Sequence, residues 1–280
     1  MCYSSWKGGY VISKIKKWIK SAAGIVSSIL FVTSIILLVA ACSDYGNFSE
    51  RTANNINNIL FSLATNLLGI IVTVSFVQHF IDMQNEKDEH KKENLKIKRY
   101  DRFMNILLTR YLMFFNCVIT PIEGRSKNNP LRLFSQFEFE DMRDLHKQSL
   151  YTCEGIFESS IELFYKSEEK LRNYMIEMIQ NIDFKYNEQL KEIIIQFVEK
   201  SIEYDMRGAI LGNITTYSSG KQMTETIMEY IKDTSHDWVG KGQRGELNSN
   251  MMLPYVQLYS LLKIEIELIG NYKDYMANIG

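Results

Sequence analysis

The chain has 280 residues, 46% of them hydrophobic, and a formal net charge of −1 at pH 7. This length suits one or two domains, and the near-neutral charge argues against a nucleic-acid-binding protein that works by bulk electrostatics, because such proteins carry a clustered excess of Lys and Arg. With only three prolines, the sequence favours long helices over many short strands. We therefore expect an all-α protein.

The first apolar stretch follows a basic segment. Residues 1–21 contain five lysines and no acid, and residues 22–42 contain no charged side chain. An α-helix rises about 1.5 Å per residue, so about 20 apolar residues match a hydrocarbon core about 30 Å thick. The sequence therefore predicts a membrane-spanning helix over residues 22–42.

A second uncharged stretch over residues 59–81 is also long enough to span a bilayer, and an Asn-rich loop of residues 43–58 joins the two. The loop has one basic residue, Arg51, whereas basic residues gather before the first span and after the second. The positive-inside rule then places both termini in the cytoplasm and the loop outside. We expect a multi-pass protein of the bacterial inner membrane.

Cys42 allows a different reading of the first span. The residues from Val39 to Cys42 resemble a bacterial lipoprotein cleavage box, and processing there would remove the first span and lipidate Cys42. A cysteine at the outer end of a span is equally well explained as a small apolar residue. The second span returns the chain to the cytoplasm in both cases.

The second span carries a polar face. Small and polar residues recur there at i, i+4, i+7 and i+11, which is one side of a helix: Ser62, Asn66, Gly69 and Thr73. An amide in hydrocarbon needs a partner, so this face should meet another helix or water. It either packs against Ser27 and Ser34 of the first span, in the same chain or in a second copy, or lines a polar path between several copies. The second reading requires a homo-oligomer, because two helices cannot enclose a pore.

Residues 82–99 are mostly charged or polar without a helix breaker, which predicts that the second span continues as a helical stalk. Apolar residues then return at helical spacing throughout residues 100–280, which predicts a cytoplasmic helical bundle. The apolar positions of its expected helices are Tyr100, Phe103, Met104, Leu107, Tyr111, Phe114, Phe115 and Val118; Leu171, Tyr174, Met175, Met178 and Ile182; Leu190, Ile193, Ile194, Phe197 and Val198; and Leu258, Leu261, Leu262, Leu268 and Ile269.

No catalytic motif is present. The glycine-rich stretch 239–250 lacks P-loop spacing and is expected to be a mobile loop, and the four histidines occur singly. The four cysteines show neither disulfide nor metal-ligand spacing, and Cys117 and Cys153 are expected to be core residues. Carboxylates such as Glu265 and Glu267 are interpreted as solvated surface. We expect no enzyme, no cofactor, no metal and no small-molecule substrate.

The run from Leu63 to Gly69, followed by the apolar residues 70–77 and the charged stalk, resembles a set of small bacterial two-span membrane proteins. The layout is most similar to the two-transmembrane effectors of retron anti-phage systems, where a reverse transcriptase and its DNA–RNA product restrain the effector. The resemblance covers the spans and the stalk, and it carries over no catalytic residue. It implies an effector that permeabilises or depolarises the inner membrane when its partner releases or triggers it, as in abortive infection.

The alternative hypothesis is a membrane-anchored helical adaptor or sensor without pore activity. Foreign spans could then replace residues 22–81 without loss of function.

Overall fold

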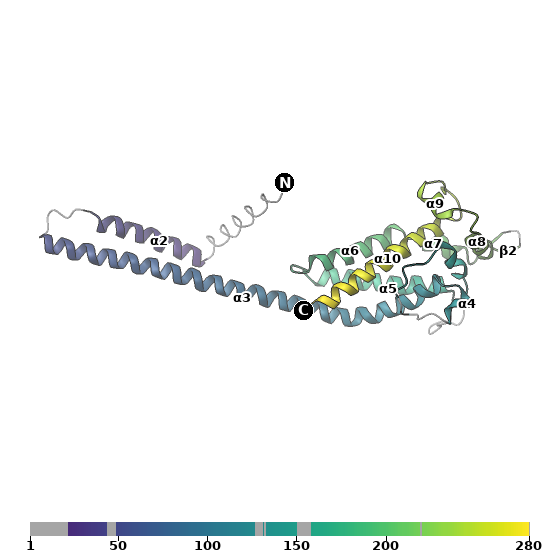
Figure 1. Ribbon diagram of the computed structural model, residues 1–280, viewed down its shortest axis with the longest axis horizontal. Coiled ribbons are helices and arrows are strands. Elements are labelled where there is room, and N and C mark those ends of the chain that lie inside the picture. Colours follow the sequence, from purple (N-terminus) through teal and green to yellow (C-terminus); the bar gives the residue numbers. More distant parts are fainter. Residues whose placement is uncertain are drawn as a thin grey trace. The chain divides into compact units, whose positions relative to one another are not determined.

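The fold is described from a computed structural model, in which residues 22–43, 49–126, 131, 133–149, 158–218 and 220–279 are described (Figure 1). The basic segment of residues 1–21 lies outside the described residues, and so do Cys2 and Cys153. The chain divides into two compact units, an N-terminal unit over Met1–Glu89 and a helical unit over His90–Gly280. Each unit is described by itself below. The described residues are mostly helical, as the sequence predicts.

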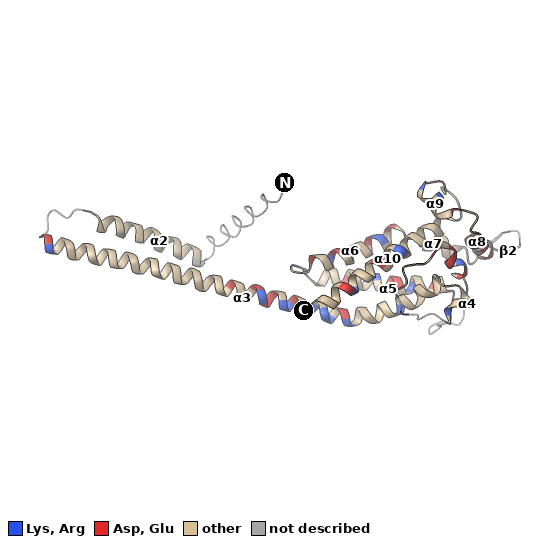
Figure 2. Ribbon diagram, in the orientation of Figure 1, with Lys and Arg blue, Asp and Glu red and all other residues tan. Residues whose placement is uncertain are grey.

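The N-terminal unit contains two apolar helices that lie side by side (Figure 1). They are α2 (Ala22–Ala41) and the first part of α3 (Glu50–Val118), and each is long and apolar enough to cross a membrane by length and composition. Charged residues are nearly absent from both until the charged run that begins at Asp82 (Figure 2).

The connection between the two apolar helices is shorter than predicted. We expected a loop over residues 43–58, but α3 already begins at Glu50. Residues 50–58 contain no Gly or Pro. The Ser49 hydroxyl lies 2.8 Å from that of Thr52 at the start of the helix. The asparagines of residues 54–58 therefore lie within the helix, because Asn is a poor helix former that still does not break a helix.

The helical unit begins with residues that we assigned to the stalk. Ile97 is fully buried in the core of this unit, and Lys96 Nζ donates a hydrogen bond of 2.5 Å to the carbonyl oxygen of Asn181. The predicted stalk over residues 82–99 therefore belongs to the helical unit from His90 onward.

After α3 come short helices, a two-stranded hairpin and longer helices (Figure 1). They are α4 (Ile122–Arg125), the 3-10 helix η1 (Phe139–Asp144), α5 (Ser160–Asn181), α6 (Glu188–Glu203), α7 (Arg207–Gly212), β1 (Tyr217–Ser218), β2 (Lys221–Gln222), α8 (Met223–Lys232), α9 (Trp238–Gln243) and α10 (Leu253–Asn278). Helix α6 packs against both α5 and α10.

Helix α5 shows how local sequence sets these elements. A capping box starts it: Ser159 accepts a hydrogen bond from the Glu162 amide, and the Glu162 side chain accepts one from the Ser159 amide. Its buried residues include Leu171, Met175 and Met178, which recur at the spacing of one helix face. The predicted apolar stripe of this helix is thus confirmed as core.

Aromatic rings fill the centre of the unit. The Tyr111 ring lies 5.5 Å from that of Phe164 and 6.2 Å from that of Phe197, so α3, α5 and α6 meet there. Phe103 differs from the prediction, because its side chain is about half exposed and lies at the edge of the core with its ring 5.0 Å from that of Tyr174.

Two local features differ from the predictions. The mostly helical fold is confirmed, but it includes a short hairpin that was not predicted, in which β1 and β2 pair antiparallel next to Gly220, whose φ of +82° suits glycine. The expected mobile loop over residues 239–250 contains α9, which starts where the Asp237 carboxylate accepts a hydrogen bond of 2.9 Å from the Gly240 amide. An aspartate cap compensates here for the poor helix propensity of glycine.

Candidate functional site

The polar face of α3 points away from α2. Its residues Ser62, Asn66, Gly69 and Thr73 are all exposed in the described chain. Thr73 donates a hydrogen bond of 2.9 Å to the Gly69 carbonyl of its own helix, whereas the Asn66 amide has no hydrogen-bond partner among the described residues. Asn66 is therefore the residue of this face whose side chain leaves two donors and an acceptor without partners among the described residues.

A different residue of α3 makes the contact with the first apolar helix. Ala64 is fully buried, and its carbonyl oxygen accepts a hydrogen bond of 3.0 Å from the Ser34 hydroxyl. Ser27 is buried as well, without a partner for its hydroxyl among the described residues. Within one chain, the structure therefore does not bring the polar face against Ser27 and Ser34. A small residue next to the polar face lets the two backbones approach instead.

Cys42 follows the last residue of α2 and is an exposed free thiol. Its backbone amide donates to the carbonyl oxygens of Leu38 and Val39, so the chain is still wound at this point. This position fits both readings of Cys42, as the lipidated residue and as a small residue at a helix end.

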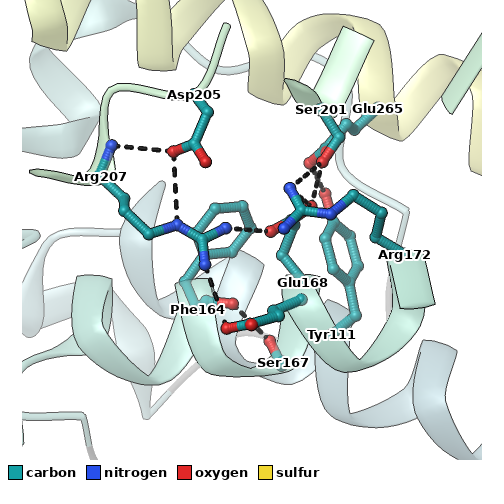
Figure 3. Close-up of polar contacts among 10 residues, drawn as sticks. Tyr111, Phe164, Ser167, Glu168, Arg172, Ser201, Asp205, Arg207 and Glu265 are labelled. Carbon is teal, nitrogen blue, oxygen red and sulfur yellow. Dashed lines mark hydrogen bonds and ion pairs between the residues drawn. The ribbon is translucent and has the colours of Figure 1, made fainter. Parts of the chain in front are cut away.

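The helical unit holds a cluster of charged groups in its core (Figure 3). Glu168 of α5 and Glu265 of α10 are both closed off from solvent. Glu168 accepts hydrogen bonds from Ser201 Oγ and from Arg207 Nη2, the latter at 2.9 Å. It also forms an ion pair with Arg172, whose Nη1 lies 3.2 Å away. One carboxylate thus joins α5, α6 and α7.

Glu265 has fewer polar partners than Glu168. Its Oε2 accepts a hydrogen bond of 2.6 Å from the Tyr111 hydroxyl, while its Oε1 is buried without a partner among the described residues. Burial raises the pKa of Glu265 well above its usual range, and the nearby charge of Glu168 raises it further. Both effects favour the protonated, neutral form of Glu265.

Burial also raises the pKa of Glu168, but the Ser201 hydroxyl and the two guanidinium groups oppose that rise. The surroundings of the two groups therefore differ: those of Glu265 on α10 favour the neutral acid, whereas Arg172 and Arg207 favour the carboxylate form of Glu168 on α5. Because neither carboxyl reaches solvent, the pair cannot act as an acid and a base on a soluble substrate. Its chemistry is that of buried polar contacts that join five helices, α3, α5, α6, α7 and α10.

Our interpretation of Glu265 as solvated surface is wrong. Sequence spacing places Glu265 and Glu267 on different sides of a helix, and only Glu267 is exposed. The sequence does contain an indication that Glu265 is buried. It lies at helical spacing from the apolar residues Leu261, Leu262 and Ile269, which are themselves buried.

Two further buried polar side chains, His146 and Arg125, hold loops in place through hydrogen bonds. Burial lowers the pKa of His146 to about 4, and its Nε2 lies 2.9 Å from the Tyr255 hydroxyl, so its imidazole is neutral at physiological pH. Arg125 is buried and donates to three carbonyl oxygens, those of Thr120, Asp144 and Gln148. We did not predict either role, because both depend on loops whose paths the sequence pattern does not define.

Among the described residues, no group of three or more His, Cys, Asp or Glu side chains is placed to hold a metal ion. No known protein family, curated protein or solved structure matches the chain. The fold and the described sites define a mostly helical protein with two apolar helices long enough to cross a membrane.

Proposed function

We propose that the chain is a two-span membrane effector of a bacterial anti-phage system of the retron type. Its helical unit receives a regulating partner in the cytoplasm, and its spans assemble to breach the inner membrane when that partner releases or triggers them. The proposal places the chain in the inner membrane with both termini in the cytoplasm.

The observation that carries the proposal is the exposed polar face of α3. Large apolar side chains of the N-terminal unit are also exposed, among them Ile36, Val72 and Phe76 at 62%, 69% and 72%. Lipid tails suit these apolar groups but leave the Asn66 amide without a partner. A ring of several copies with Asn66 inward satisfies both, since the amide then faces water or another amide.

The charge distribution of α3 supports a polyanionic partner such as a DNA–RNA complex. Between His90 and Val118, α3 carries seven basic residues and two acids. Glu93 accepts hydrogen bonds from Tyr186 and Asn187, and Asp101 accepts one from Tyr272, so both acids are engaged by other parts of the helical unit. Five exposed basic residues form no ion pair among the described residues: Lys91, Lys92, Lys98, Arg99 and Arg102.

The test is membrane potential and dye entry in bacteria after induced expression, compared between the wild type and the variant Asn66→Leu. We expect rapid depolarisation that Asn66→Leu abolishes at equal protein levels. Asn66→Gln keeps an amide and should retain activity. Thr65→Val is the matched control, because Thr65 is exposed on the same helix and bonds only to its own helix backbone.

Full activity of Asn66→Leu would contradict the assembly of spans around the polar face. A larger change separates the two hypotheses. If the chain is an adaptor, a foreign two-span hairpin can replace residues 22–81 without loss of function, whereas the proposed effector should lose its activity.

A further inference from the structure

The polar face of α3 continues into two phenylalanines. Phe76 and Phe80 follow Thr73 by three and seven residues, so they lie on the same side of the helix as Thr73. Both side chains are exposed in the described chain, at 72% and 52%. Large aromatic rings thus replace small and polar side chains in the part of this face that leads to the cytoplasmic end of the proposed span.

Helix α2 covers the other side of α3. Ala64 is fully buried and accepts a hydrogen bond from Ser34 of α2. The residues that share its side of the helix are half-buried: Leu60, Leu67, Ile71, Val74 and Gln78. At about 100° per residue, Phe80 lies about 160° from Ala64 around the helix axis. The side that carries Phe80 is therefore the side on which a second copy of the chain can pack.

The polar face and the two rings belong to one unbroken helix. Helix α3 extends over Glu50–Val118, and the chain has no Gly or Pro between Gly69 and Pro121. Sharp kinks in helices almost always occur at such residues or where the hydrogen-bond ladder is interrupted. If Asn66 points into an assembly of several copies, as proposed above, Phe80 therefore points into it as well.

Polar side chains return beyond the rings. Gln84 and Lys87 follow Phe80 at i+4 and i+7 on the same side of the helix, and both are exposed. The face is thus polar from Ser62 to Thr73, apolar at the two rings and polar again after them. In an assembly with this face inward, the rings form a constriction within the path and not its end.

Apolar rings in a narrow path hold back ions without any charge of their own. An ion that passes them must give up water, and an apolar ring offers no hydrogen bond in exchange. Hydrophobic constrictions close channels in this way, because water withdraws from them and ions cannot follow. A modest widening of the constriction lets water return, which suits a path that opens on a signal.

We propose that the Phe76 and Phe80 rings of several copies form a hydrophobic gate that keeps the path closed until the spans move apart. The gate is formed by exposed side chains of a span, so it requires no ligand and no titrating group. This inference rests on the proposed membrane activity and adds the element that regulates it.

The experiment measures the ionic current across planar bilayers of phosphatidylethanolamine and phosphatidylglycerol that hold the purified full chain. Phe80→Ser replaces the ring with a small polar side chain, so it should hold the path open. We expect the current to rise about tenfold or more, since a barrier lowered by about 1.4 kcal/mol already gives that factor. Phe80→Leu keeps a bulky apolar side chain and should retain the small current of the wild type.

Phe61→Ser is the matched control. Phe61 is a phenylalanine of the same helix with a similar exposure of 56%. It lies about 140° around the helix from Asn66, away from the polar face, so its replacement should leave the current unchanged. Adding Asn66→Leu to Phe80→Ser should abolish the current, because the open path still depends on the polar face.

A current of Phe80→Ser equal to that of the wild type would overturn the gate. An equal rise in Phe61→Ser would overturn it too, because the position of the ring on the polar face would then not matter. The proposed function would survive either result if the wild type still depolarises bacteria in a way that depends on Asn66. If no variant carries current and expression of the wild type leaves the membrane potential intact, the proposed function itself fails, and the gate fails with it.

Discussion

At the scale of single residues, Glu265 is the side chain that is least expected in an apolar helical core. A Leu at this position would pack with the neighbouring apolar residues, whereas Glu265 brings a carboxyl group whose Oε1 has no partner among the described residues. Replacing buried ionisable groups by apolar ones often leaves a protein equally or more stable.

Glu265 makes the folding stability depend on pH. Its pKa is higher in the folded chain than its ordinary value of 4.5, so the folded state keeps the proton longer than the unfolded state does. The stabilisation is complete below pH 4.5 and is lost as the pH rises towards the folded pKa. In Glu265→Gln the side chain is neutral at every pH, so this variant should lose less stability than the wild type as the pH rises.

The measurement is the thermal midpoint of the full chain in detergent between pH 5 and pH 9. The difference between Glu265→Gln and the wild type should widen with pH in favour of the variant. Glu267→Gln, exposed on the same helix, should follow the wild type at every pH. Parallel curves for Glu265→Gln and the wild type would contradict a raised pKa of Glu265.

His146 makes the folding stability depend on pH in the opposite direction. Its pKa of about 4 lies below the ordinary value of 6.5, so the unfolded chain binds the proton first as the pH falls. Stability should drop between pH 6.5 and about 4, by on the order of 3 kcal/mol from this group, at roughly 1.4 kcal/mol per pKa unit. His146→Gln should remove that drop, while His236→Gln at an exposed site should keep it, as measured by urea unfolding at several pH values.

These residue-level features show where prediction from sequence stops. Helical spacing identifies Leu171, Met175 and Met178 as core because their burial follows from periodicity alone. The same reasoning cannot assign Glu265, since its burial depends on the Tyr111 hydroxyl, which lies 154 positions away in the chain. Periodicity predicts which face is buried and does not reveal which polar groups find partners there.

At the scale of elements, α9 and α10 show how closely one glycine allows two elements to pack. A Cβ at Gly242 would lie 2.6 Å from Val256 Cγ1, which is too close for real atoms. Gly270 within α10 has nothing within 4 Å of the same position. Glycine is therefore required at the first site and is a weak point of the helix at the second.

We expect Gly242→Ala to destabilise the chain by about 1–3 kcal/mol, the usual cost of overpacking. Gly270→Ala should stabilise it by about 0.5–1 kcal/mol, because alanine is the better helix former. Chemical unfolding of the two variants beside the wild type checks both signs. Equal effects of the two substitutions would contradict the contact between α9 and α10.

Element boundaries were harder to predict than element types. The end of α3 at Val118 was predictable, because Pro121 follows closely and prolines prevent helix continuation. Its start at Glu50 was not, because residues 50–58 are polar yet contain no breaker. The β1–β2 hairpin was missed for a related reason, since two-residue strands leave too few positions for any alternating pattern.

At the scale of the whole molecule, α3 takes part in both compact units. The sequence has no Gly or Pro between Gly69 and Pro121, so nothing in it favours a hinge. In the proposed effector, a signal received by the helical unit would pass along this helix to the spans. A break in the helix at the border of the units should therefore prevent a signal received by the helical unit from activating the spans.

Asn85→Pro tests this idea, because proline within a helix costs about 3 kcal/mol and removes a backbone donor. We expect the variant to reach the membrane at normal levels but to lose dye entry, whereas Asn85→Ala should behave as the wild type. Normal dye entry with Asn85→Pro would show that the units act without a continuous helix.

The hydrogen bond from Ser34 to the Ala64 carbonyl has a consequence for biogenesis. In the proposed membrane setting, a newly made first helix would carry its buried hydroxyls into lipid before the second helix emerges from the ribosome. The pairing with Ala64 becomes available only when both helices are present. Insertion of the two helices as one hairpin lets the Ser34 hydroxyl enter the bilayer already bonded, so the insertion machinery should hold the first helix until the second arrives.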